Sequence, residues 1–490
     1  MDRQAVNSVI RAAVVALVVF IAFQFFFGKR EAGNSLKEVK AVKEVEVKLP
    51  VPPSKELGKV VKVDTPLYRA EISTVNGKVV SLFVKQYGAQ LISDASKKFG
   101  IFPLMTVSDD KALSAELSAL ELTPDKELIE VKDAPRKLVL TGKLKDGRVF
   151  KKIFTFYPDS YRIDFSAELE GANLETLIGL DIKVNEARSS HMGHVGPVLE
   201  TEREIVRLKP EEITPFLSFG KVIWAGEEDK YFLLAVKDSV FSVTVENLKG
   251  HTLVRNFVSN GVFYGGPKEL NRLESLGMDA AIDFGIFGFL AKPMLKFFLF
   301  LHRFIPNWGV VIIVLTVIVK LLLHPLAHKS YVSMKKMQEL APKLEEIKKR
   351  YGKDPQKLQE ETMKLYREAG VNPASGCLPM LLQIPIFFAL YEIFLNAVEL
   401  KGASFLWIKD LSLPDPTYIL PVLMGASMIA QQFLTPTANK EQQKIFLIMA
   451  VVFTFLFATF PAGLVLYWFT NNVITALQNL VIMKVMERAG

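Results

Sequence analysis

The sequence is almost without cysteine, which excludes two common kinds of site. Cys377 is the single cysteine among 490 residues, so there is neither a disulfide framework nor a cysteine-based metal centre. Motifs for nucleotide and hydrolytic chemistry are also missing: the chain has no Gly-Lys-Ser/Thr phosphate loop, no HExxH sequence and no nucleophile elbow. We therefore expect a protein that is not an enzyme and that holds no metal or other cofactor.

Hydrophobic residues make up 50% of the chain, and their distribution is uneven. Residues 59–280 have the composition of a soluble domain, whereas most of 286–483 is rich in Phe, Leu, Ile and Val. The formal net charge is +8, and the basic residues cluster beside apolar stretches. That placement favours loops facing anionic lipid over a nucleic-acid surface.

Six apolar stretches predict six transmembrane helices. The first lies in residues 1–28, and no small-x-small cleavage pattern follows it, so we expect a retained anchor. The second spans 307–327, and four more lie within 377–483. The segment between, 286–306, is interrupted by charged residues and proline, which indicates an amphipathic helix at the outer interface.

Loop charge predicts the orientation of these spans. Residues 328–376 are densely basic, and Lys and Arg stay on the cytoplasmic side of a membrane. Both termini, including the tail at 484–490, are then cytoplasmic, and residues 29–285 lie outside. A seventh span at 286–306 would reverse this parity.

The outer segment is predicted to be a linker followed by an all-β domain. Residues 29–58 are rich in Lys, Glu, Val and Pro without core periodicity, as in a flexible linker. Within 59–285, apolar and polar residues alternate over 161–169, and turn pairs such as Asn76-Gly77 separate similar runs. A large β-sandwich is expected.

Two histidines in this domain, His191 and His194, lie in the segment SSHMGHVGP without a carboxylate at ligand spacing. We interpret them as loop histidines and not as metal ligands.

The basic segment 328–376 has the pattern of a helical hairpin. Apolar residues from Met337 to Tyr351 are spaced alternately by three and four, Gly352–Pro355 breaks the helix, and a second stripe ends at Gly370. The hairpin either merely connects two spans or serves as a docking arm, and the sequence leaves both open.

Lys320 is the most informative polar residue inside an apolar stretch. It lies twelve residues after Trp308, so a helix places it about 18 Å below the outer interface. A lone charge at that depth usually marks a cavity or pathway. The alternative is that its long stem reaches the inner headgroups.

Polar residues in other spans favour the cavity. Thr316 shares a helical face with Lys320, Gln383 precedes Pro385, and no acidic residue lies deep enough in a span to neutralise the amine. The last span carries a polar stripe formed by Trp468, Asn471, Asn472, Thr475, Gln478 and Asn479. In the alternative interpretation, part of this stripe serves only to join helices. An unpaired cation needs water, so we expect an open, hydrated recess.

Three segments closely resemble the YidC membrane protein insertases of bacteria with an outer membrane: GVNPASGCLPMLLQIPIFFALY, FPAGLVLYWFTNN and FLWIKDLSLPDPTYILPVLMG. The resemblance covers essentially the whole chain. It implies an inner-membrane protein with a five-helix insertase core and a non-catalytic periplasmic β-supersandwich at 59–285.

The resemblance also implies a set of groove residues. Lys320 falls where the family has its single groove cation, usually arginine, so the charge is kept but the planar fork is lost. Positions that line the family's groove or contact substrate are matched by Thr316, Gln383, Phe387, Tyr467 and Trp468, and the polar stripe adds Asn471, Asn472 and Thr475.

The implied function is the insertion and folding of integral membrane proteins, alone or with the Sec translocon. Implied partners are nascent membrane proteins, Sec components, a ribosome or targeting factor at 328–376, and anionic lipids, with no nucleic acid beyond the ribosome. Two alternatives stay open: a secondary transporter of a small anion bound at Lys320, although no inverted repeat is visible, and a membrane-tethered carbohydrate-binding or -processing protein.

Overall fold

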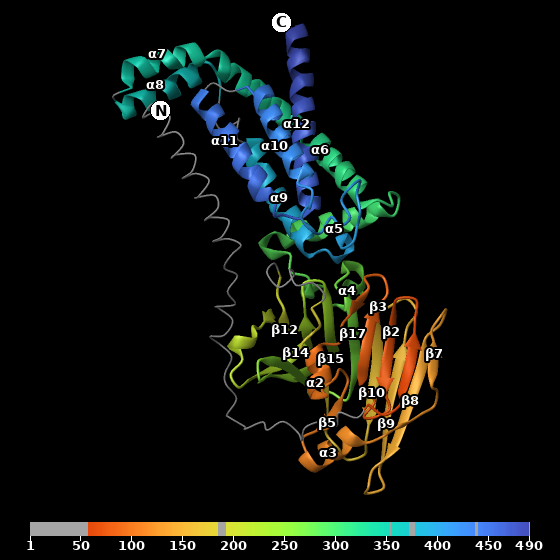
Figure 1. Cartoon of the computed structure of the whole chain (residues 1–490). Coiled ribbons are helices and arrows are strands. Elements are labelled where there is room, and N and C mark those ends of the chain that lie inside the picture. The colour runs from red at the N-terminus through yellow and green to blue at the C-terminus, as the bar shows by residue number, and fades with distance from the viewer. Residues whose placement is uncertain (1–56, 185–192, 353, 372–377, 437–439, 490) are drawn as a thin grey trace. The chain divides into compact units, whose positions relative to one another are not determined.

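The computed structural model describes residues 57–184, 193–352, 354–371, 378–436 and 440–489. The described chain divides into two compact units, a β-rich unit that ends at Asp283 and a helical unit that begins at Phe284. The anchor predicted at 1–28, nearly all of the predicted linker, and His191 lie outside the described residues. Figure 1 shows the elements of both units.

The smaller sheet of the β-rich unit has five strands in the order β4-β3-β2-β1-β7. They are β1 (Val60–Asp64), β2 (Tyr68–Ser73), β3 (Val79–Val84), β4 (Ala89–Gln90) and β7 (Leu128–Glu130). Neighbours are antiparallel except β1 and β7. Between β2 and β3, Asn76 and Gly77 both have positive φ, 64° and 65°, so the predicted turn is confirmed.

The larger sheet has twelve strands. They are β5 (Thr106–Ser108), β6 (Thr123–Pro124), β8 (Arg136–Lys143), β9 (Val149–Phe156), β10 (Arg162–Glu168), β11 (Leu174–Leu180), β12 (Gly196–Thr201), β13 (Ile205–Arg207), β14 (Phe216–Glu228), β15 (Phe232–Leu248), β16 (His251–Asn256) and β17 (Asn260–Pro267). The strand predicted at 161–169 is β10, whose Ile163, Phe165 and Ala167 are buried. The prediction is confirmed because one face of this strand is covered.

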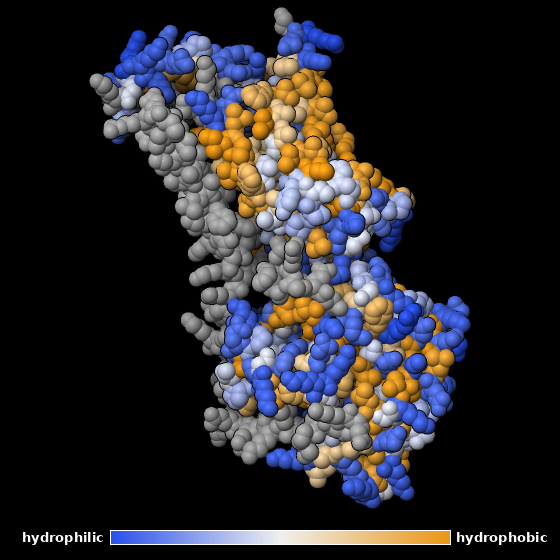
Figure 2. Space-filling view, viewed as in Figure 1, coloured by the Kyte–Doolittle hydropathy of each residue, from blue (hydrophilic) through white to orange (hydrophobic). Residues whose placement is uncertain are grey.

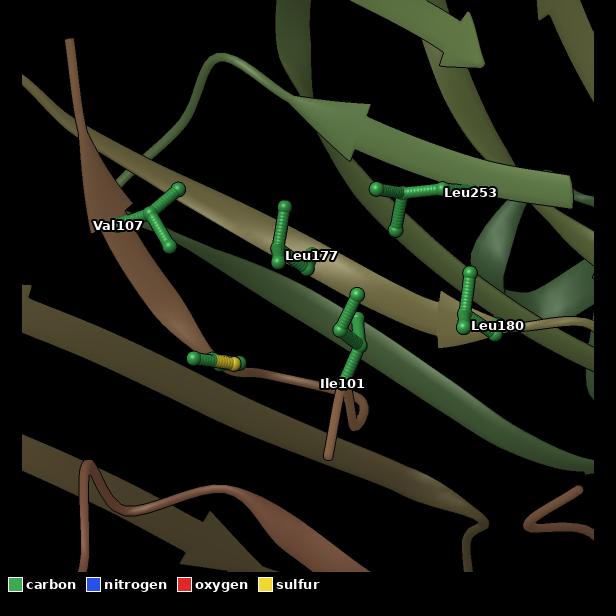
Figure 3. Close-up of a cluster of buried hydrophobic side chains, with 6 residues drawn as sticks. Ile101, Val107, Leu177, Leu180 and Leu253 are labelled. Atoms are coloured by element: carbon green, nitrogen blue, oxygen red, sulfur yellow. The ribbon is translucent and has the colours of Figure 1, made fainter. Parts of the chain in front are cut away.

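A hydrophobic cluster fills the space beside β5, β11 and β16 (Figure 3). Its members are Ile101, Met105, Val107, Leu177, Leu180 and Leu253. Short helices complete the unit: α2 (Asp94–Phe99), α3 (Lys111–Ala119), η4 (Pro210–Glu212), α4 (Leu270–Leu276) and η5 (Asp279–Ala281). The N-cap carboxylate of Asp110 accepts bonds from the first turn of α3, which explains where that helix begins.

The helical unit begins with η6 (Gly285–Phe287) and α5 (Gly288–His302) and continues with long helices (Figure 1). These are α6 (Trp308–Glu339), α7 (Ala341–Tyr351), α8 (Pro355–Glu368), α9 (Leu378–Asn396), η8 (Val398–Leu400), α10 (Ile419–Leu434), α11 (Lys440–Phe457) and α12 (Ala462–Ala489). Asn307 caps α6, because its side chain accepts a hydrogen bond from the Val310 amide. This helix runs without interruption past residue 327, where the sequence predicted its span to end.

The helical hairpin predicted from the basic segment is formed by α7 and α8, which lie against each other. The helix break predicted at 352–355 is confirmed: α7 ends at Tyr351, and α8 begins at Pro355 behind the capping side chain of Asp354. The predicted apolar stripe from Met337 to Tyr351 is divided between two helices, because α6 ends at Glu339 and α7 begins at Ala341.

Two described helices are long and apolar enough to cross a bilayer, Gly285–His302 and Trp308–Glu339. Three shorter apolar helices follow, Gln383–Asn396, Ile419–Leu434 and Gln443–Phe457. Figure 2 shows hydrophobic side chains gathered over the bundled helices and hydrophilic ones over α7 and α8. The number of spans therefore stays a prediction. The first of these helices is the segment that the sequence assigned to the interface.

Candidate functional site

The predicted groove residues lie on α6, α9 and α12. Helix α12 lies against both α6 and α10, and α9 contacts α6 and α12. Residues far apart in the chain are thereby brought together, since α6 and α12 are separated by more than a hundred residues.

Lys320 is half-buried between α6 and α12. Its ammonium nitrogen donates a 2.9 Å hydrogen bond to the hydroxyl of Thr475, which itself donates to the Asn471 carbonyl at 2.7 Å. An ammonium has three N–H donors, so one bond leaves two available. Among the described residues Lys320 forms no ion pair, and Glu392 instead accepts a 3.1 Å bond from Asn396.

A second contact between the same helices follows one turn further along α12. The side-chain amide of Gln478 donates to the Lys320 carbonyl at 3.3 Å and lies 3.3 Å from Nδ1 of His324. Gln478 thus fixes the register of α12 against α6 immediately beside the amine.

Asn471 has a spare acceptor near this contact. Its side-chain oxygen is buried and has no hydrogen-bond partner among the described residues. A buried carbonyl oxygen without a partner is costly, and a bound water or an incoming polar group would relieve that cost. The Asn471 oxygen and the two available Lys320 donors are the groups that give this site its capacity to bind polar ligands.

Thr316 lies one turn before Lys320 but is 1% exposed, and its hydroxyl donates to the Ile312 carbonyl of its own helix at 2.7 Å. Thr316 is therefore buried, and its hydroxyl is bonded within its own helix.

Aromatic residues on α9 and α12 form a separate group. Gln383 donates a hydrogen bond to the hydroxyl of Tyr467, which is 2% exposed. The rings of Phe387 and Trp468 are perpendicular with centroids 4.9 Å apart, and the ring of Phe457 is tilted by 48° to that of Trp468 with centroids 5.1 Å apart. These four predicted residues form two pairs between α9 and α12, and no described hydrogen bond links them to Lys320.

Asn472 faces a different helix from Asn471. Its amide donates to the Ser427 hydroxyl of α10 at 3.1 Å, and Asn479 donates to Thr435 of the same helix at 3.2 Å. The polar stripe of α12 is therefore divided: Asn471, Thr475 and Gln478 are near α6, whereas these two asparagines join α12 to α10.

Sequence reasoning missed the α10 partners, Ser427 and Thr435. A partial signal was present, because Asn472 and Asn479 are seven residues apart on α12 and therefore lie near one helical face. Thr435 directly follows Leu434, the last residue of α10, so its pairing could not be read from helical periodicity.

The histidine loop of the β-rich unit holds no metal cluster within the part of the chain that the structure describes. His194 lies with Nε2 3.2 Å from the carbonyl oxygen of Pro197, and burial lowers its pKa.

The chain matches two family models and many known proteins. Residues 300–489 match the family described as 60Kd inner membrane protein, and residues 60–242 match the YidC periplasmic domain. The "Membrane protein insertase YidC" of Aquifex aeolicus (strain VF5) is 39% identical over 426 residues, 86% of this chain and 82% of that protein. The protein of the same name from Campylobacter jejuni is 32% identical over 511 residues, 98% of this chain and 96% of that one.

A solved structure titled "Active YidC insertase crystal structure with the first transmembrane domain resolved" is 22% identical. It covers 96% of this chain and 98% of its own, with a TM-score of 0.41. The relationship rests on the sequence matches and not on this likeness.

Proposed function

Because the chain belongs to the YidC family of membrane protein insertases, we propose that it inserts its substrates through a hydrated, positively charged recess around Lys320. The protein is a bacterial inner-membrane insertase, it is not an enzyme, and it binds substrate membrane proteins. The family match displaces the transporter and carbohydrate alternatives.

The observation that carries this proposal is the environment of Lys320. The amine is half-buried, it has the hydroxyl of Thr475 and no carboxylate as its partner among the described residues, and the buried, unpaired oxygen of Asn471 belongs to the residue one turn before Thr475. An uncompensated charge within an apolar helix is stable when water reaches it. A recess that holds water there lowers the cost of bringing backbone amides and acidic side chains partway across the bilayer.

Insertion then proceeds without nucleotide hydrolysis. A short polar segment of the substrate enters the recess from the cytoplasmic side, while its apolar helix moves sideways into lipid. Each Leu or Phe gains about 0.3–0.6 kcal/mol on entering the bilayer centre, so a full span supplies the driving force. Acidic segments gain most from the cation, and the membrane potential assists them.

The domain layout belongs to the same proposal. It has six transmembrane helices, the last five forming the insertase core, with both termini cytoplasmic. The parts are an anchor at 1–28, a linker at 29–58, a periplasmic β-supersandwich at 59–285, an interfacial helix at 286–306, a second transmembrane helix at 307–327, a cytoplasmic hairpin at 328–376, transmembrane helices 3–6 at 377–483 and a cytoplasmic tail at 484–490. The groove set is Lys320, Thr316, Gln383, Phe387, Tyr467, Trp468, Asn471, Asn472 and Thr475, with Asn472 acting through the packing of α12 on α10.

The hairpin α7–α8 is the proposed docking arm for a ribosome, a targeting factor or the nascent chain. Its basic residues Lys348, Lys349 and Arg350 end α7 and are all exposed. Exposed cations at a helix C-terminus suit an anionic partner such as ribosomal RNA or lipid headgroups. Cooperation with the Sec translocon is part of the same proposal.

The test reconstitutes the full chain in liposomes and measures protease protection of two single-span substrates, one with an acidic and one with a neutral polar segment. Lys320→Glu should slow insertion of the acidic substrate by about tenfold or more, equivalent to about 1.4 kcal/mol, and affect the neutral one less. Lys320→Arg should preserve insertion. Lys484→Glu, on an exposed position of α12, is the matched control. Equal insertion of the acidic substrate by Lys320→Glu and the parent protein would remove the charge from the mechanism.

A further inference from the structure

The segment between η8 and α10, residues 401–418, is folded against the N-terminal ends of three long helices; we call it the outer latch. At α6, the Asn307 side chain donates to the Ser404 carbonyl at 3.3 Å. Gly309 lies against the ring of Phe405, so closely that a Cβ built on it would come within 2.2 Å. The start of α6 is therefore shaped to receive the latch.

The same segment receives the start of α12. The amides of Ala462 and Gly463 donate to the latch carbonyls of Leu413 and Leu411, at 2.8 and 2.9 Å. The first amides of a helix have no partner within the helix, so an outside acceptor is needed. The latch supplies two such acceptors from a backbone that is itself fixed.

Asp415 is the centre of the latch and is 1% exposed. One carboxylate oxygen accepts from the backbone and hydroxyl of Thr417 at 3.0 and 2.7 Å. The other accepts from the Leu420 amide at 2.9 Å, in the first turn of α10, and from the indole of Trp407 at 3.3 Å. A single side chain therefore joins the start of α10 to the middle of the latch.

The charge of Asp415 is stabilised by these donors. Burial alone would raise the pKa of its carboxyl, but hydrogen bonds from Leu420 and Thr417 outweigh burial and hold the pKa below its usual range. The side chain therefore remains an acceptor at both oxygens. Among the described residues it forms no ion pair, so its charge is compensated by dipoles and the end of α10.

We propose that the outer latch closes the periplasmic end of the recess, and that Asp415 is the positioning residue that holds it closed. The latch ties together the starts of α6 and α12, the two helices that carry Lys320 and Thr475. This inference rests on the proposed function, which supplies both the recess and the side on which the latch lies. In this proposal, the buried carboxylate of Asp415 keeps the periplasmic end of the recess closed, so that the recess opens only toward the cytoplasm.

The experiment measures whether a cysteine placed in the recess reacts with a reagent added on the cytoplasmic or on the periplasmic side. The full chain carries Asn471→Cys in a Cys377→Ser background and is labelled with a membrane-impermeant maleimide in vesicles of either orientation. With Asp415 intact, labelling from the cytoplasmic side is fast and labelling from the periplasmic side is slow. Asp415→Asn turns one acceptor into a donor, which in either amide orientation faces a backbone N–H, that of Thr417 or that of Leu420. It should raise the periplasmic rate about tenfold or more, or about 1.4 kcal/mol in the opening equilibrium.

Two further variants make the test specific. Asp410→Asn is the matched control, since the Asp410 carboxylate accepts from the Ser412 amide within the latch at 2.8 Å and has no described hydrogen bond to α6, α10 or α12. It should leave both rates unchanged. Phe405→Ala loosens the contact with Gly309 without touching Asp415 and should also raise the periplasmic rate, which keeps the test valid if Asp415→Asn does not fold.

The outcomes separate the two ideas. A probe that is not reached from the cytoplasmic side in the parent protein contradicts the proposed recess itself. A probe that is reached from the cytoplasmic side in every variant, but no faster from the periplasmic side in Asp415→Asn or Phe405→Ala, contradicts the latch alone.

Discussion

Replacing Thr475 with valine measures how wet the surroundings of Lys320 are. Valine has nearly the shape of threonine but no hydroxyl, so the substitution removes the 2.9 Å bond from the amine and the 2.7 Å bond to the Asn471 carbonyl. The carbonyl keeps its helical partner, so the principal loss falls on the amine.

The size of the effect distinguishes a dry site from a hydrated one. In a dry site, a hydrogen bond to a charged group is worth about 1.5–3 kcal/mol, which corresponds to a loss of roughly 10- to 150-fold in rate. Where water takes the place of the hydroxyl, the cost falls to about 1 kcal/mol or less, under about fivefold. Because Lys320 is half-buried, we expect the smaller loss.

The assay is insertion of the acidic single-span substrate into liposomes, with thermal unfolding in detergent recorded in parallel. Thr475→Ser, which keeps the hydroxyl, should behave as the parent protein. A loss of tenfold or more in Thr475→Val, with the serine variant unaffected, would show that water cannot replace the hydroxyl and would refute the hydrated recess.

Three other perturbations have definite expected outcomes. Asn472→Ala removes a side-chain bond between α12 and α10 and should lower unfolding stability in detergent by about 0.5–1.5 kcal/mol. Gly309→Ala puts a Cβ 2.2 Å from the Phe405 ring and should cost about 1–3 kcal/mol in the same assay. Burial lowers the pKa of Lys152 to about 7 from 10.5, so the unfolded chain binds more protons between these values and the stability of the β-rich unit should rise from pH 7 to 10. Urea unfolding followed by fluorescence of Trp224 measures this rise, and Lys152→Met should reduce it to the part due to Lys78, whose pKa burial lowers to about 8.

Local pattern was enough to predict much of the secondary structure. Alternation over 161–169 identified a half-covered strand, and Asn76-Gly77 identified a turn whose positive φ values few other residues accept. Both predictions succeeded because each depends on only a few neighbouring residues. The strand depends on one buried face, and the turn depends on residues that accept a positive φ.

The partners within the site were beyond local pattern. Asn472 and Thr475 are three residues apart on α12, yet Asn472 bonds to Ser427 of α10 and Thr475 to Lys320 of α6. The partner of Lys320 is 155 residues away, and only the register of α12 on α6 selects Thr475. Periodicity gives the face of a helix but not the neighbour that this face meets. Whether the predicted set lines a path for substrates is a question for the insertion assays.

The unbroken α6 has a mechanical consequence. Its 32 residues give a rod of about 48 Å, well beyond the roughly 30 Å of a hydrocarbon layer. Pro325 lies within this rod, five residues after Lys320, and lacks the amide that would bond to the Leu321 carbonyl. The helix therefore lacks one backbone hydrogen bond close to the amine, so bending of α6 at Pro325 would change the position of Lys320 relative to Thr475.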